Sequence, residues 1–435
     1  MNNWEFALRA LRARNYRLFF SGQSVSVIGT WMTRVATAWL VYRLTKSAVL
    51  LGIVSFSGQV PAFFLAPIAG VWIDRWDRRR TLVVTQVLSM LQSFALAALA
   101  LAGVIQVWEV IVLALVQGII NAFDMPARQS FVIQMVERRE DLGNAIALNS
   151  SMVNMARLIG PAVAGFLISV AGEGYCFLAD GLSYIAVVAS LLMMRMRVAE
   201  TRPERRDIWP DLVEGWRYVS GSPPIRLILL LLGLVSLVAM PYTVLMPIFA
   251  SAILHGGPHT LGYLTSAAGL GALTGAISLA MRRSVVGLGS RIAVASALFG
   301  ASLIVFALSR YLWLSLLILP LTGFAMMQQM AASNTILQTI VEDGKRGRVM
   351  SFYAMAFQGM APFGSLLAGT MASRIGAPAT LVMGGSLCIG GSALFAHRLP
   401  ALRKLVRPIY ERLGILPEVA MAVHNTSEMQ TPPQT

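Results

Sequence analysis

The sequence predicts an all-α membrane protein with twelve transmembrane helices in two pseudo-symmetric six-helix bundles. Three observations lead to this prediction: the composition, a series of long apolar stretches, and the alternation of positive charge from one side to the other. Hydrophobic residues make up 56% of the 435 residues and charged residues only 13%, with a mean hydropathy of +0.68. Soluble domains carry about 25% charged residues, so this chain has too few to cover a water-exposed surface of its size.

Twelve apolar stretches are long enough to cross a bilayer, which takes about 20 residues of helix. They centre near residues 30, 61, 92, 116, 159, 185, 240, 271, 300, 322, 361 and 388. Cytoplasmic loops carry an excess of Lys and Arg, which sets the orientation. With a cytoplasmic N-terminus, 29 of the 35 Lys and Arg residues lie on the cytoplasmic side and four on the other. We therefore expect both termini in the cytoplasm.

A long charged stretch divides the chain in the middle. We expect a six-helix bundle over residues 1–197, a cytoplasmic loop over 198–226, a second bundle over 227–398 and a cytoplasmic tail over 399–435. Apolar residues at helical spacing in 207–220 are typical of an amphipathic helix on a membrane surface. The polar composition of the tail predicts disorder from His424 onward. A weak repeat relates the halves, because Gly160-Pro161 in the fifth span corresponds to Ala361-Pro362 in the eleventh.

The loop between the second and third spans carries the strongest local motif. Residues 70–80 read GVWIDRWDRRR, which combines a glycine that lets helices approach, an aspartate at the helix end and arginines at the headgroups. The string resembles the loop motif G-x-x-x-D-R-x-x-R-R of the major facilitator superfamily, with these residues at the motif positions: Gly70, Asp74, Arg75, Arg78 and Arg79. The resemblance implies a twelve-helix transporter with a gate at this loop. Asp77 stands where many members carry glycine, and the alternative is an ordinary positively charged loop.

The next polar segment, residues 121–129 (NAFDMPARQ), is similar to a subgroup of that superfamily which includes siderophore exporters and macrolide-type efflux proteins. Residues 15–19 (NYRLF) and 39–45 (WLVYRLT) are similar to it as well. We expect residues 121–129 to form a loop in which Asp124 and Arg128 pair with the Asp74 loop and close the cytoplasmic side. The alternative is a solvated loop whose charges only set the topology.

The fifth span carries a second motif. Residues 156–165 read ARLIGPAVAG and resemble the antiporter motif G-x-x-x-G-P-x-x-G-G, with Gly160, Pro161 and Gly165 at matching positions. This resemblance implies an exporter, whereas the alternative is ordinary close packing through small residues. In the fourth span, Ala114 occupies the place where proton antiporters carry an intramembrane arginine. Proton coupling through that arginine is therefore excluded.

Ionisable residues inside a membrane are candidates for function. Arg34 in the first span could attract an anionic group of a substrate or pair with Asp180 in the sixth. Asp180 could also carry a proton, because burial makes an unpaired carboxylate charge costly. Glu109 lies near a membrane surface, and Arg157 lies near mid-depth in the fifth span. Polar or aromatic residues near mid-depth form a pool of possible substrate contacts, each of which could instead pack helices: Gln23, Thr30, Gln59, Gln117, Tyr242, Gln328 and Gln358.

The sequence carries no signature of an enzyme, a metal site or a cofactor site. It has no G-x-x-x-x-G-K-[ST] motif for nucleotide binding, and its four histidines and two cysteines lack ligand spacing. The net charge of +15 is spread in short runs between apolar stretches, which argues against nucleic-acid binding. The N-terminus lacks the separate apolar region of a cleavable signal peptide.

The residues and the resemblance together predict a secondary active transporter of a bacterial inner membrane. We expect it to export an amphiphilic small molecule, such as a drug-like compound or a siderophore, by alternating access coupled to protons. Its partners would be that small molecule, protons and the lipid bilayer, and a monomer would suffice. Two alternatives stay open: an importer of a small nutrient on the same scaffold, and a non-transporting membrane sensor or partner protein.

Overall fold

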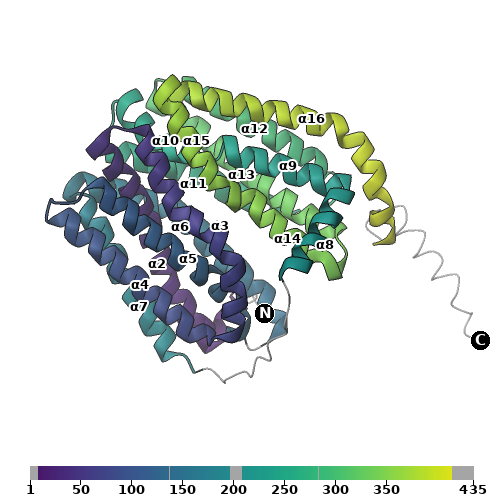
Figure 1. Cartoon of the computed structure of the whole chain (residues 1–435), viewed down its shortest axis with the longest axis horizontal. Helices are drawn as coiled ribbons and strands as arrows, with labels where there is room; N and C mark the ends of the chain where they lie inside the picture. The colour runs from purple at the N-terminus through teal and green to yellow at the C-terminus, as the bar shows by residue number, and fades with distance from the viewer. Residues whose placement is uncertain (1–7, 137, 196–207, 283, 414–435) are drawn as a thin grey trace, which may run out of the picture.

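The computed structural model describes residues 8–136, 138–195, 208–282 and 284–413, which are almost entirely helical (Figure 1). The predicted disorder from His424 and the first part of the expected central loop, residues 198–207, fall outside the described residues. The side chains at three positions of the predicted gating motif, Gly70, Asp74 and Arg75, fall outside them as well.

The first half of the chain forms six long helices with short connections. The elements are η1 (Arg9–Arg12), α2 (Arg14–Thr45), α3 (Ala48–Arg75), α4 (Arg78–Leu101), α5 (Val107–Met135), η2 (Arg139–Asp141), α6 (Leu142–Ala171) and α7 (Glu173–Met193). Ser47 and Asp77 start α3 and α4 as N-caps, since their side-chain oxygens accept hydrogen bonds from backbone N–H groups three residues on. Asp77 thus caps α4, at the motif position where glycine is common.

The second half repeats this pattern with more interruptions. Its elements are α8 (Ile208–Gly221), α9 (Pro223–Val238), α10 (Tyr242–Ile248), η3 (Phe249–Ile253), α11 (Pro258–Ala280), α12 (Leu288–Leu308), α13 (Leu312–Ile340), α14 (Asp343–Ala354), η4 (Met355–Gly359), α15 (Met360–Ile375) and α16 (Ala377–Arg412). The segment predicted to be amphipathic is helical and forms α8, which an Arg348–Glu214 ion pair of 2.9 Å holds against α14. Both η3 and η4 are π-helical turns, which appear mostly as local bulges within α-helices.

Ten of the described helical segments are long and apolar enough to cross a membrane. The predicted spans near residues 30 and 361 are not among them. Polar residues such as Gln23, Thr30 and Arg34 reduce the hydropathy of α2. The π-helical turn of η4 divides the second segment into the shorter pieces α14 and α15. The architecture is therefore an almost all-helical protein with ten candidate spans.

Two glycines at equivalent places join consecutive helices. Gly172 connects α6 to α7 with φ 94°, and Gly376 connects α15 to α16 with φ 85°. Side chains other than glycine rarely adopt such positive φ values, because the Cβ atom meets the backbone. The same sharp turn thus recurs in both halves of the chain, in line with the weak sequence repeat.

Helices α2 to α7 pack mainly on one another, and α9 to α16 do the same (Figure 1). The two groups meet chiefly along two helix pairs, α3 with α15 and α6 with α11. At the first pair, a methyl group on Gly52 would lie 2.7 Å from the carbonyl oxygen of Ser365 and 3.3 Å from Cα of Gly369. Glycine is needed there because the two backbones approach so closely.

The molecule has two ends with different character. We call the end that carries residues 46–47, 102–106, 172, 254–257, 309–311 and 376 the short-loop face, and the opposite end the basic face. The contact between Gly52 and Gly369 lies about one turn from the short-loop face. At the basic face, a separate apolar cluster including Tyr16, Phe131 and Met135 is built from the first half alone. The two halves are thus joined near the short-loop face.

Candidate functional site

The predicted gating loop is tied to α5 by aromatic rings. Trp72 and Trp76 stack on Phe123 with ring centroids 6.1 and 6.4 Å apart. Arg79 donates hydrogen bonds of 2.7 Å to the carbonyl oxygens of Leu191 and Leu192, at the end of α7. Those carbonyls have no partner within the helix, so the motif arginine acts as a C-terminal cap. Arg78 also has interaction partners.

Asp124 and Arg128 lie inside a helix, which corrects the expectation that residues 121–129 form a loop. Helix α5 continues through Pro126 to Met135. Asp124 is only 4% exposed, and its Oδ1 accepts hydrogen bonds from Thr85 (2.9 Å) and Gln86 (2.7 Å) of α4. Its other oxygen forms an ion pair with Arg128, one turn later. Asp124 is therefore buried at the contact of α4 with α5 rather than solvated.

Arg34 and Arg157 converge on one tryptophan. The guanidinium carbon of Arg34 lies 4.8 Å from the ring centroid of Trp31, and that of Arg157 lies 5.2 Å from the same centroid. Both distances are within the range of cation–π attraction. Trp31 and Arg34 are three residues apart on α2 and so share one face of it, while Arg157 reaches them from α6.

Neither arginine of this cluster is neutralised by a carboxylate. Within the described residues, Arg34 forms no ion pair and Nε and Nη1 of Arg157 are buried without a hydrogen-bond partner. The side chain of Arg34 is exposed. The proposed pairing of Arg34 with Asp180 is thus wrong for this conformation. We call Trp31, Arg34 and Arg157 the arginine–tryptophan cluster.

Asp180 is held on a different face of α2. Its Oδ2 accepts hydrogen bonds of 2.9 Å from Thr33 of α2 and from Ser93 of α4. Thr33 is one residue from Arg34 and hence about 100° around the helix. Asp180 is 2% exposed, and its Oδ1 has no hydrogen-bond partner in the described part of the chain. It is therefore a buried carboxylate that hydroxyl groups stabilise on one side only.

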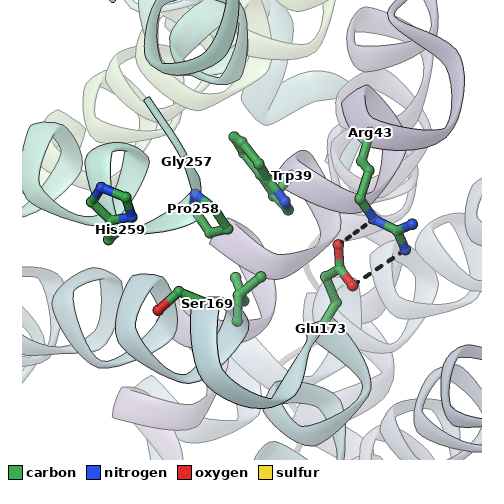
Figure 2. Close-up of a pocket in the computed structure, with 8 residues that line it drawn as sticks. Trp39, Arg43, Ser169, Glu173, Gly257, Pro258 and His259 are labelled. Atoms are coloured by element: carbon green, nitrogen blue, oxygen red, sulfur yellow. Dashed lines mark hydrogen bonds and ion pairs between the residues drawn. The ribbon is translucent and has the colours of Figure 1, made fainter. Parts of the chain in front are cut away.

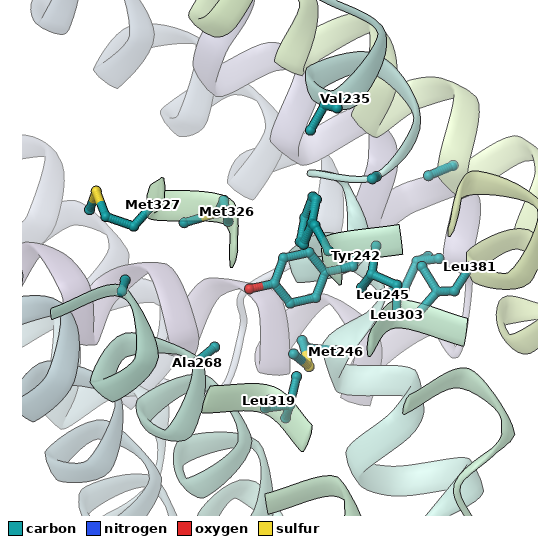
Figure 3. Packing of buried hydrophobic residues seen from close by; sticks show 14 of the residues in the cluster. Val235, Tyr242, Leu245, Met246, Ala268, Leu303, Leu319, Met326, Met327 and Leu381 are labelled. Atoms are coloured by element: carbon teal, nitrogen blue, oxygen red, sulfur yellow. The ribbon is translucent and has the colours of Figure 1, made fainter. Parts of the chain in front are cut away.

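The second half contributes an apolar wall that includes Tyr242. Tyr242 of α10 interacts electrostatically with Arg157 and packs edge-on against Phe299 at 6.1 Å. Figure 3 shows its hydroxyl group pointing toward the side on which Met326 and Met327 of α13 lie. Methionine side chains adapt to different shapes, which suits a binding surface. All three residues are less than 10% exposed.

The remaining candidates have local partners. Gln59 is exposed and donates to Ser55 of its own helix, which in turn contacts Ser365 of the second half. Gln117 donates hydrogen bonds of 3.1 Å to Ser89 and Asn121. Gln328 is 2% exposed and donates to the carbonyl oxygen of Gly275, between α13 and α11.

The antiporter-like motif lies where α6 contacts both halves. A methyl group on Gly160 would lie 2.6 Å from Cβ of Trp31 on α2, and one on Gly165 would lie 2.9 Å from the carbonyl oxygen of Pro258. A methyl group on Gly262 of α11 would likewise lie 2.6 Å from the carbonyl oxygen of Pro161. The small residues of this motif thus permit the contact between the halves and also place Trp31.

A hollow of about 540 Å³ lies at the short-loop face, close to this contact (Figure 2). Arg43 donates hydrogen bonds of 2.7 and 3.3 Å to the two carboxylate oxygens of Glu173 on one side of it. Gly257, Pro258 and His259 of the second half line the other side. This ion pair could not be predicted from the sequence, because Arg43 and Glu173 lie at helix ends far apart in the chain and share no motif.

Among the described residues, no group of three or more His, Cys, Asp or Glu residues could hold a metal ion. Trp31 and Ser93 were also missed as candidates. The three-residue spacing of Trp31 and Arg34 was a signal that could have identified the tryptophan. Ser93 gave no signal, since a serine in an apolar helix is commonplace.

The sequence matches a family described as transmembrane secretion effector over residues 6–429. It is 26% identical to the staphyloferrin A transporter of Staphylococcus aureus over 385 residues, which cover 88% of this chain and 96% of that protein. It is 28% identical to the multidrug efflux pump Tap of Mycolicibacterium fortuitum, over 87% of this chain and 93% of the pump. Macrolide efflux protein A of Streptococcus pyogenes is 23% identical over 93% and 98% of the respective chains.

Solved structures of transporters share the fold. A bacterial homolog of the human lysosomal transporter Spinster, in an inward-facing and unoccupied conformation, has a TM-score of 0.65 at 14% identity, over 92% of this chain and 98% of that one. A POT family transporter in complex with a thioalcohol-conjugated peptide has a TM-score of 0.70 at 12% identity, over 89% and 96%. At these identities the likeness concerns the fold alone.

Proposed function

We propose that this chain, which belongs to the transmembrane secretion effector family of the major facilitator superfamily, exports an amphiphilic small molecule from a bacterial cell by alternating access. Membership makes it a multi-pass membrane transporter rather than an enzyme. Its relatives, a staphyloferrin A transporter and drug efflux pumps, support export of a small molecule.

Twelve spans in two bundles suit this mechanism. Helix α2 is the longest helix before α16 and supplies the first span, and α14, η4 and α15 together supply the eleventh. The bundles then correspond to α2–α7 and α9–α16, with the central loop between them and the tail after them. The recurrence of the glycine turn at Gly172 and Gly376 supports this division. A single chain contains both bundles, so a monomer is sufficient.

The charge distribution orients the protein with the basic face in the cytoplasm of an inner membrane. The short-loop face is then outside, and the conformation is closed there by the α3–α15 and α6–α11 contacts. Residues 70–80, with Asp124 and Arg128, lie on the cytoplasmic side, where the loop acts as the inner gate. The arginine–tryptophan cluster would be reached from the cytoplasm in this state and from outside after the bundles rock.

The observation that carries the proposal is a positively charged cluster among the spans, for which the described part of the chain provides no acidic partner. A transporter needs such groups to recognise a polar part of its substrate at mid-depth. Asp180 is the coupling residue we propose, because it can gain or lose a proton while Thr33 and Ser93 remain its partners. No arginine in the fourth span is then required for proton coupling.

Retention of a panel of amphiphilic dyes, anionic and cationic, tests this function in cells. Cells with the wild type should retain less of at least one dye than cells without it, and a protonophore should abolish the difference. Asp180→Asn should also abolish it, whereas Asp343→Asn, at an exposed helix start, should not. Higher retention in wild-type cells would instead identify an importer, and equal retention throughout would contradict export of these compounds.

A further inference from the structure

We infer that the transported molecule is an organic anion, with an acidic group bound between Arg34 and Arg157 and an aromatic or apolar body beside Trp31 and Tyr242. The inference rests on the proposed function, because it specifies the substrate class of the same site. It is carried by two positively charged side chains, the exposed Arg34 and the partly buried Arg157, which share one indole and have no acidic partner among the described residues.

The groups of the two arginines that lack hydrogen-bond partners are all donors. A guanidinium group has five N–H donors and no acceptor. Nε and Nη1 of Arg157 are buried without a partner within the described ranges, and no ion pair is found there for Arg34. Carboxylates and phosphates offer the paired acceptors that match this geometry, while a cationic ligand would meet only repulsion.

Asp180 does not serve as the counter-ion of the cluster. Asp180 of α7 accepts hydrogen bonds from Thr33 and Ser93, on the side of α2 that packs against α7. The cluster faces α6 instead, where Gly160 makes room for Trp31. Asp124, the other deeply buried aspartate that the structure describes, is already paired with Arg128. The positive charge of the cluster thus remains for a ligand.

The surroundings define the rest of the ligand. Trp31 presents an aromatic ring next to both cations, and an aromatic ligand can pack against such a ring. Tyr242 interacts electrostatically with Arg157, and its hydroxyl group points toward the side on which Met326 and Met327 of the apolar wall lie (Figure 3). A small hydrophilic anion would leave this wall unused. The arrangement therefore fits an acidic group joined to an apolar or aromatic body.

The test compares two probes with the same type of ring system and opposite charge, carboxyfluorescein as the anion and rhodamine 123 as the cation. Binding to the purified full-length protein in nanodiscs is measured by fluorescence anisotropy. We expect the wild type to bind carboxyfluorescein more tightly than rhodamine 123. Arg34→Gln and Arg157→Gln should each weaken carboxyfluorescein binding about tenfold, the usual loss for one charge-assisted contact. Neither should weaken rhodamine 123 binding.

Two control variants make the outcome specific. Arg310→Gln removes an equal charge at the short-loop face and should leave both affinities unchanged. Arg34→Lys keeps the charge and should retain part of the anion binding, so a folding defect of the Gln variants is separable from loss of charge. Tighter binding of rhodamine 123 by the wild type, equal binding of both probes, or Gln variants that bind carboxyfluorescein normally would each overturn the inference.

This result is separable from the proposed function. Export of the cationic dye from cells would support the proposed function and contradict the inferred substrate class. A protein that binds the anion through both arginines but moves no dye would keep the site and lose the function.

Discussion

The buried carboxylate of Asp124 is fully satisfied, unlike that of Asp180. Thr85, Gln86 and Arg128 together bind both of its oxygens, whereas only one oxygen of Asp180 has partners within the described residues. A fully bonded buried charge is costly to disturb, because removing it leaves its partners without a counter-group. The two aspartates therefore suit different roles, Asp124 in fixing helices and Asp180 in the proton exchange that we propose.

This contrast predicts the effect of Asp124→Asn on stability. Loss of the charge leaves the partly buried Arg128 without an ion pair, and we expect a loss of about 1–3 kcal/mol. The thermal midpoint of the detergent-solubilised protein measures it. Asp343→Asn removes a carboxylate that is 91% exposed in its ion pair with Arg346, and it should cost less than about 1 kcal/mol. Equal midpoints for both variants would show that Asp124 does not stabilise the α4–α5 contact.

Residue types in the sequence pointed to Arg34 and Asp180 but not to their partners. A charged residue within an apolar stretch is conspicuous in the sequence, which is why Arg34 and Asp180 could be predicted as candidate functional residues. Which groups converge in space depends on helix rotation, and a shift of one residue turns a side chain by about 100°. The Arg34–Asp180 pair, one of the two possibilities for Arg34, is not formed for that reason, and the convergence of Arg157 on Trp31 could not be predicted.

At the scale of helices, apolar length predicted most elements well and the ends of helices less well. The charged and polar composition of residues 121–129 suggested a loop, yet α5 continues to Met135 because its polar groups pair with α4 and with one another. Conversely, the π-helical turn at Met355–Gly359 divides a stretch that reads as continuous. Tertiary contacts decided both cases, and hydropathy does not report them.

The contact between α3 and α15 gives a prediction at this scale. A side chain on Gly369 would lie 2.6 Å from the carbonyl oxygen of Ala48 and 3.0 Å from Cα of Gly52, so Gly369→Val should separate the two helices. Spin labels at Lys46 and Arg374 would report a longer distance across the short-loop face, and the closed conformation should become less populated.

Gly390→Val is the matched control for this experiment. Gly390 also lies within a helix, α16, but a methyl group there would meet nothing within 4 Å. Its label distances should equal those of the wild type. If Gly369→Val left the label distances unchanged, the close approach of α3 to α15 would not be the cause of closure at the short-loop face.

The whole molecule consists of two helical groups, α2–α7 and α9–α16, which are joined near the short-loop face. The arginine–tryptophan cluster lies between the two ends of the molecule. The positive-charge pattern, the motif of residues 70–80 and the hydropathy together predicted the family and the general fold, since these features are read along the chain. The asymmetry between the joined short-loop face and the basic face could not be predicted in this way. It depends on the conformation that one sequence adopts among those of its transport cycle.

Transport into everted inner-membrane vesicles tests the central claim, gradient-driven export, most directly. An exporter moves its substrate inward in such vesicles, so the compound identified by the retention assay should accumulate when the vesicle interior is made acidic. Nigericin, which collapses the proton gradient, should abolish accumulation, and Asp180→Asn should do the same. Accumulation only in right-side-out vesicles, or accumulation that persists without the proton gradient, would contradict gradient-driven export.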